Sequence, residues 1–208
     1  FYQIYLKMVF AIMIAFLVAI VLSKRISTRK LFHISIGPIF LHFCIEFSPL
    51  NIAERISLAL IPASSAIIFL LCPHFAILLP FKKMIERNNR TQLFGVVSYG
   101  FLFAIFPFYR KQSLLSALIC LAFGDGFSAF GSNLAKILKE KQWTNKTRSG
   151  SLLCFVCSYF GQKAFGLGNL QSLVGSIICT IAEHIFKQDN VWVVALTWLA
   201  QEVLVQLK

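Results

Sequence analysis

The sequence predicts an all-α, polytopic integral membrane helix bundle with seven or eight transmembrane helices. Hydrophobic residues make up 58% of the 208 residues, and phenylalanine alone occurs 22 times. An ordinary soluble domain is closer to half apolar. The apolar residues also fall in runs near the twenty that cross a bilayer, without the polar face of a soluble amphipathic helix. We therefore expect one integral membrane domain over residues 1–208.

The expected spans follow from apolar windows of this length. In chain order they cover residues 1–22, 34–50, 56–81, 92–109, 113–133, 151–168, 172–187 and 191–207. We expect the first to be a span and not a signal peptide, because it is longer than a signal core and no small-residue cleavage site follows it. The second and seventh are short, so either can be tilted, re-entrant or merged with a neighbour.

The formal net charge of +12 predicts the orientation of these spans. Lysine and arginine concentrate in the first, third and fifth loops, whereas the opposite face has only Arg55, Arg110, Lys111 and Lys208. The positive-inside rule therefore places the odd-numbered loops in the cytosol. Attraction to anionic head groups, about 1 kcal/mol per basic residue near the surface, accounts for part of this charge. We expect membrane lipids, and no nucleic acid, as its partner.

Asp125, one of two aspartates in the chain, lies between two glycines in the stretch LAFGDGFSAFG. A carboxylate within a span is costly and by default marks a functional site. Glycine on both sides allows a phosphate oxygen or a hydrated cation to approach the backbone closely. The alternative is a stripe of small residues for close helix packing, which does not explain the carboxylate. The stripe consists of Gly124, Gly126, Ser128, Gly131 and Ser132.

The basic loop after this span ends in the stretch NKTRSGS, residues 145–151. If the next helix begins near Ser151, then Ser149 or Ser151 can cap it, and its first N–H groups form an anion site. Lys146 and Arg148 lie beside that helix start and suit charge-assisted contacts to phosphate. The other lysines of this loop are expected to be solvated.

The second aspartate, Asp189, is followed by Asn190 and lies in the predicted topology on the same cytosolic face as Asp125. Two carboxylates that reach a common point can hold Mg²⁺, which leaves its other positions to water and phosphate. The alternative is that Asp189 and Asn190 only cap the last helix.

Arg29, Lys30 and His33 are spaced so that a helix places them on one side at the membrane surface. His33 is a candidate proton acceptor for an alcohol, or a donor to phosphate. A basic collar with a surface histidine is the alternative. Arg90 opens the fourth span on the same face, where an interface anchor would also account for it.

Taken in order, these motifs resemble a family of membrane lipid kinases. The family includes dolichol kinase, phytol and farnesol kinases and the nucleotide-dependent diacylglycerol kinase of fungi, and it is related to CDP-diacylglycerol synthase. The matching positions are Arg29, Lys30, His33, Gly37, Arg90, Gly95, Tyr99, Gly124, Asp125, Gly126, Ala129, Gly131, Lys146, Gly150, Ser151, Asp189 and Asn190. Ser149 and Thr91 stand where that family often has glutamates.

The resemblance implies transfer of a phosphoryl group from CTP, or another nucleotide, to the hydroxyl of a polyprenol-type lipid alcohol or diacylglycerol at the cytosolic face. It implies that Asp125 and Asp189 bind Mg²⁺ or another divalent cation. Asp125, Lys146 and His33 are then the candidate catalytic residues. The candidate phosphate-binding residues are Arg29, Lys30, Arg90, Gly124, Gly126, Gly131, Arg148, Gly150, Ser151 and Asn190.

Two alternatives stay open. The same basic, aspartate-containing face suits a CDP-diacylglycerol synthase, which transfers a cytidylyl group to phosphatidic acid. The chain can also be a transporter or a non-enzymatic membrane protein. A transporter is expected to place its polar site near the bilayer midplane, often within repeats, and the sequence has no internal repeat.

Overall fold

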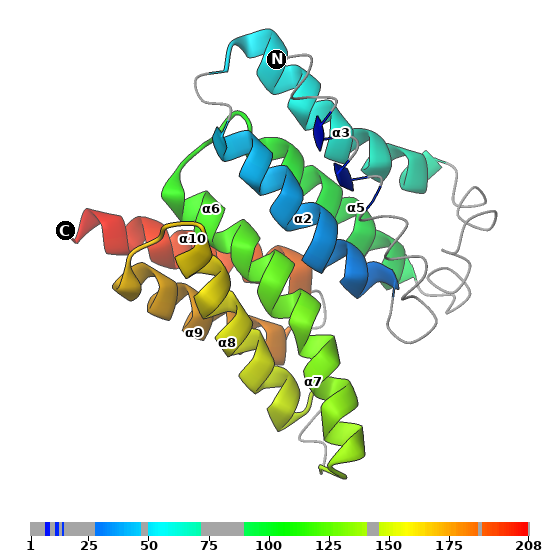
Figure 1. Cartoon of the computed structure of the whole chain (residues 1–208), viewed down its shortest axis with the longest axis vertical. Helices are drawn as coiled ribbons and strands as arrows, with labels where there is room; N and C mark the ends of the chain where they lie inside the picture. The colour runs from blue at the N-terminus through cyan, green and yellow to red at the C-terminus, as the bar shows by residue number, and fades with distance from the viewer. Residues whose placement is uncertain are drawn as a thin grey trace. The chain divides into compact units, whose positions relative to one another are not determined.

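The computed structural model describes residues 7–8, 11–12, 14, 28–46, 50–71, 90–140, 146–186 and 189–207. Within these ranges the protein is all-helical, with seven helices and no strand (Figure 1). One of the seven is built from three consecutive segments, α6, the π-helical η2 and α7. The bounds are α2 Thr28–Glu46, α3 Ile52–Leu71, α5 Arg90–Ile105, α6 Gln112–Ile119, η2 Cys120–Asp125, α7 Gly126–Ile137, α8 Arg148–Ala164, α9 Asn169–Ile185 and α10 Asp189–Gln206.

Every predicted span from the second to the eighth coincides with one of these helices. Most of the predicted span 1–22 and the end of span 56–81 lie outside the described residues. Helix α2 begins at Thr28, six residues before the predicted start of the second span. An apolar window stops at charged residues, whereas Arg29 and Lys30 are good helix formers and extend the helix.

Among the described helices, the continuous helix Gln112–Ile137 is long and apolar enough to cross a membrane. Most of its residues are buried, which is also true of the central helix of a soluble protein. The chain divides into two compact units, Phe1–Arg110 and Lys111–Lys208.

The first unit contains α2, α3 and α5. Helices α3 and α5 approach closely at Gly100, where a Cβ atom would lie 2.6 Å from the carbonyl oxygen of Pro62 and 2.8 Å from the Cβ of Ala66. Aromatic contacts join α2 to α5, including an edge contact between Phe40 and Phe103 with ring centroids 6.0 Å apart. The unit therefore combines a close small-residue crossing with an aromatic seam.

The second unit surrounds a buried amide, Gln162 of α8, which is 0% exposed. Its Nε2 donates to the carbonyl oxygen of Ser172 at 3.2 Å and to the hydroxyl of Ser176 at 3.1 Å, both in α9. Its Oε1 accepts a hydrogen bond from the hydroxyl of Ser116 in α6. A buried network that is satisfied in this way fixes the order and register of the three helices.

Helix α10 completes the second unit through hydrogen bonds at two points. Gln201 Nε2 donates to the carbonyl oxygen of Gln171 in α9 at 2.7 Å. The hydroxyl of Ser113 in α6 donates to Glu202 Oε1 at 2.6 Å. These bonds connect α10 to both α9 and the start of the long helix.

Candidate functional site

Asp125 is the last residue of η2, and its side chain is completely buried. The π-helical segment interrupts an otherwise regular helix, and such segments occur frequently at functional sites. The backbone carbonyl of Asp125 accepts a hydrogen bond of 2.8 Å from the hydroxyl of Ser128. A carboxylate in a buried position is retained only where protein groups, a proton or a metal ion compensate its charge.

Gly124 allows η2 to pack tightly against α8 and α9. A Cβ atom at this position would overlap the hydroxyl oxygen of Ser158 and lie 2.8 Å from the sulfur of Cys179. Close helix packing, the alternative considered from sequence, therefore applies to Gly124. Access for a phosphate oxygen at this glycine stays a prediction.

Gly131 and Gly150 face each other where α7 meets the start of α8. A Cβ atom on Gly131 would lie 2.7 Å from the Cα of Gly150, and one on Gly150 would lie 2.9 Å from Thr147 Oγ1. A side chain on Gly131 would push the two helices apart, and one on Gly150 would displace the hydroxyl of Thr147 and crowd α7. The pair thus holds the basic loop end close to the helix that carries Asp125.

Helix α8 begins at Arg148, and its N-cap is Thr147. The hydroxyl oxygen of Thr147 accepts the N–H of Gly150 at 3.1 Å. The predicted cap at Ser149 or Ser151 is therefore wrong. Thr147 has the extended backbone that a cap residue needs, whereas Ser149 and Ser151 already lie within the helix.

A carboxylate from the chain itself occupies the start of α8. Glu140 Oε2 accepts the backbone N–H of Ser149 at 3.1 Å, and Glu140 Oε1 accepts the hydroxyl of the same serine. These hydrogen bonds, the hydroxyl first, together with the nearby charge of Arg148 lower the pKa of Glu140. An anion is thus favourable at this helix start, as the sequence predicts, but an internal glutamate accepts the bonds from Ser149.

The interaction with Glu140 makes stability sensitive to acid. A depressed pKa means that Glu140 stabilises the fold above its unfolded pKa, and that this contribution disappears as the pH falls through the folded pKa. Ser149→Ala removes the hydroxyl donor, which is the largest cause of the lowered pKa of Glu140. We expect this variant to be less stable at neutral pH and to lose less stability on acidification, as measured by thermal unfolding from about pH 7 down to about pH 2.5, well below the unfolded glutamate pKa of about 4.3. An unchanged acid dependence would contradict this role of Glu140.

Lys146, the strongest candidate for a phosphate contact, pairs with a residue that the sequence reasoning did not select. Its ammonium group forms an ion pair with Glu183 Oε1 in the last turn of α9. The side chain of Glu183 is only 1% exposed, whereas that of Lys146 is 25% exposed. The second oxygen, Oε2, has no hydrogen-bond partner within the described parts of the chain. The pair therefore carries a buried carboxylate with capacity for a further donor or cation.

A cavity of about 440 Å³ opens beside this ion pair. Three of the residues predicted to contact phosphate line this cavity, Lys146, Arg148 and Ser151. Two polar residues of α9 that the sequence reasoning did not select, Thr180 and His184, also line it. The surface that lines the cavity is mostly apolar, and Lys146 and Arg148 add cationic groups that can bind phosphate.

No family model matches this chain, and no curated protein or solved structure is significantly similar to it. The resemblance to membrane lipid kinases therefore rests on the sequence motifs alone.

The predicted metal ligands belong to two helices of the second unit, Asp125 to the middle of the long helix and Asp189 to the start of α10. Asp189 and Asn190 form the first turn of α10, and Asn190 is 2% exposed. The side chain of Asp189 lies outside the described residues. Among side chains that the structure does describe, no group of three or more His, Cys, Asp and Glu residues is placed to hold a metal ion. A cation held by Asp125 and Asp189 stays a prediction.

The remaining candidates belong to the first unit. His33 is 2% exposed, and its ring stacks on Tyr99 with centroids 4.2 Å apart. The hydroxyl of Tyr99 donates to the carbonyl oxygen of His33 at 3.4 Å. His33 therefore joins α2 to α5 and does not lie on the exposed surface that its spacing predicts. Lys30 is partly exposed, whereas the side chains of Arg29 and Arg90 lie outside the described residues.

Proposed function

We propose that this chain is an integral membrane lipid kinase that transfers a phosphoryl group from CTP, or another nucleotide, to a lipid hydroxyl. The acceptor class is a polyprenol-type alcohol or diacylglycerol. The observation that supports this most directly is the cavity at the start of α8, which gathers Lys146, Arg148 and Ser151 beside a buried ion pair. Phosphoryl transfer depends mainly on positioning and on neutralising phosphate charge, which such a set of cations and donors provides.

A multi-pass arrangement with seven or eight spans is part of this proposal. It is supported by the coincidence of predicted apolar spans with helices and by the membrane-length helix Gln112–Ile137. The positive-inside pattern puts the basic loop before α8 on the cytosolic side. A nucleotide then reaches Lys146 and Arg148 from the cytosol, while the lipid acceptor stays in the bilayer.

In the proposed reaction, the lipid oxygen forms a bond to the terminal phosphorus of the nucleotide. The bond between that phosphorus and the bridging oxygen breaks, and the nucleoside diphosphate leaves with the electron pair. The proton of the hydroxyl is released to water. Because the transition state is loose, the step does not need a strong base. Lys146 and Arg148 would orient the nucleotide and neutralise its charge.

Asp125 has the chemistry that a Mg²⁺ site needs, since Mg²⁺ commonly takes one or two carboxylates and completes its shell with water and phosphate oxygens. Its buried carboxylate lies at a π-helical turn, with Asp189 as its predicted partner. The cation would supply positive charge to the phosphates of the nucleotide.

The test is a product analysis with purified protein, Mg²⁺ and a panel of prenols and diacylglycerol. With CTP labelled in its terminal phosphate, we expect a labelled phospholipid and unlabelled CDP. With CTP labelled in the cytidine and phosphatidic acid as acceptor, formation of a labelled CDP-lipid and pyrophosphate would instead identify a CDP-diacylglycerol synthase. If no acceptor is phosphorylated with CTP, ATP or GTP, the kinase proposal is wrong.

A further inference from the structure

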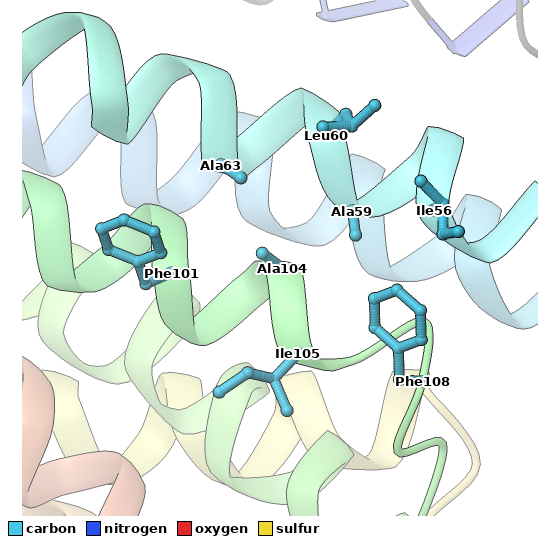
Figure 2. A pocket seen from close by; sticks show the side chains of 8 residues that line it. All are labelled: Ile56, Ala59, Leu60, Ala63, Phe101, Ala104, Ile105 and Phe108. Atoms are coloured by element: carbon cyan, nitrogen blue, oxygen red, sulfur yellow. The ribbon is translucent and has the colours of Figure 1, made fainter.

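An apolar groove runs along the surface of the first unit between α3 and α5, and Figure 2 shows it from close by. Its volume is about 410 Å³. Three alanines, Ala59, Ala63 and Ala104, contribute only methyl groups to its lining. Larger side chains surround them, and Ile56 and Phe108 lie at one end of the view.

The larger lining residues are unusually exposed for their type. Leu60 is 57% exposed, Ile56 47% and Phe108 45%. From Ile56 to Ala63 the groove follows α3 for about 10 Å, given the helix rise of 1.5 Å per residue. Its lining is entirely hydrocarbon apart from the backbone. This surface suits an extended alkyl chain better than a polar ligand.

Two arginines lie near the end of the groove that is lined by Ile56 and Phe108. Arg55 directly precedes Ile56, and Arg110 follows Phe108 by two residues. Burial, and to a smaller extent the charge of Arg55, lower the pKa of Arg110, and the nearby thiol of Cys44 acts in the opposite direction. The two guanidinium groups are therefore close enough for their charges to interact.

Both guanidinium groups are held in place by backbone carbonyl groups. Arg55 Nε donates to the carbonyl oxygen of Leu50 at 3.1 Å. Arg110 Nη2 donates to the carbonyl oxygen of Cys44 and, at 3.2 Å, to that of Ile45. A guanidinium has five N–H groups, so each arginine keeps donors for another ligand.

The neighbouring glutamates are engaged with other groups. Glu54 accepts the backbone N–H of Asn51 at 2.9 Å, and Glu46 lies 3.2 Å from His42 Nε2. Within the described residues, neither Arg55 nor Arg110 forms an ion pair with a carboxylate. An external anion would neutralise this pair of like charges.

We propose that the groove binds one acyl chain of an anionic phospholipid whose phosphate is held by Arg55 and Arg110. An alkyl chain and an anionic head match the two adjoining surfaces, one apolar and one cationic. In the predicted topology both arginines lie in the second and fourth loops, on the face opposite the basic loops. The ligand is a bound membrane lipid and not the substrate of the proposed kinase, so its binding can be tested without activity.

The test is native mass spectrometry of the delipidated protein with dioleoyl phosphatidylglycerol, dioleoyl phosphatidylcholine or inorganic phosphate. We expect phosphatidylglycerol to bind about tenfold more tightly than phosphatidylcholine. Arg55→Gln combined with Arg110→Gln should remove this preference. Ala63→Leu combined with Ala104→Leu fills the groove without changing its charge and should weaken the binding of both lipids.

Matched controls are available on the second unit. Lys136→Gln removes an exposed positive charge, and Ala195→Leu adds the same bulk at an exposed position of α10. Both should bind phosphatidylglycerol as the parent does. Since Arg110 also binds carbonyl groups of α2, Arg55→Gln alone keeps the charge test valid if the double variant does not fold.

Four results would overturn the proposal. They are equal binding of the two lipids by the parent, undiminished binding after the groove is filled, tight binding of inorganic phosphate without a lipid, and a dimer that the groove-filling substitutions dissociate.

Discussion

Asp125→Asn is expected to lower lipid phosphorylation by at least about a hundredfold while leaving the helical fold intact. The amide has nearly the shape of the carboxylate but carries no charge, so it cannot neutralise a bound cation. Because Asp125 is completely buried, loss of its charge also removes a cost of burial. The unfolding temperature should therefore change much less than the turnover rate. The measurement compares initial rates over a Mg²⁺ titration with thermal unfolding of the same preparations.

Glu202→Gln provides the matched control for this experiment. Glu202 is a carboxylate of the same unit, but it accepts a hydrogen bond from Ser113 at the start of the long helix. Ser113 and Asp125 are twelve residues apart, or about 18 Å along a helix axis. The control should keep its turnover and its Mg²⁺ dependence. If Asp125→Asn retains near-parental activity, the predicted cation role of Asp125 is wrong.

Neutralising Lys146 should destabilise the protein more than neutralising its ion-pair partner Glu183. Lys146→Gln leaves a carboxylate that is 1% exposed without its cation, and breaking a buried pair in this way costs about 3–5 kcal/mol. Glu183→Gln leaves a lysine whose side chain is 25% exposed and can be hydrated. The free energy of unfolding should therefore fall less than in Lys146→Gln. Equilibrium unfolding of the two variants in the same detergent measures the difference.

The double variant separates the structural role of this pair from its role in phosphate binding. Lys146→Gln combined with Glu183→Gln removes both charges and should recover much of the stability that Lys146→Gln alone loses. Activity should not recover, because the proposed phosphate contact of Lys146 is still absent. Recovery of activity together with stability would mean that Lys146 acts only through folding.

The helical architecture could be predicted from sequence because it depends on long apolar runs, which are a local property of the chain. The runs between residues 113 and 207 correspond to the helices of the second unit with small shifts at their ends. The start of α2 was harder to place, since Arg29 and Lys30 can either end an apolar run or continue a helix. The π-helical segment from Cys120 to Asp125 could not be predicted, because apolar periodicity does not distinguish it from an α-helix.

The candidate site could be predicted only in part, because its ion pairs connect distant positions. Lys146 and Arg148 follow from the basic stretch and do line a cavity. Glu183 lies 37 residues from Lys146 in the sequence, and no local pattern connects the two. A useful signal was available, since a glutamate within an otherwise apolar helix needs a partner. That reasoning does not extend to Glu140, which accepts two hydrogen bonds from Ser149 but lies in the charged loop after α7.

The π-helical turn also sets the rotational phase of the long helix. Its wider hydrogen-bonded ring accommodates one residue more than an α-helical turn, so every residue after Asp125 is turned relative to a regular continuation of α6. One residue of an α-helix corresponds to about 100° of rotation. If the same residues wound as a regular α-helix without any change in chain length, Gly131 would rotate away from Gly150, although every side chain of α7 would be unchanged. Deleting one residue between Cys120 and Asp125 would instead remove the extra residue and should keep Gly131 against Gly150. The contact between α7 and the start of α8 is thus determined by a backbone irregularity at the preceding turn.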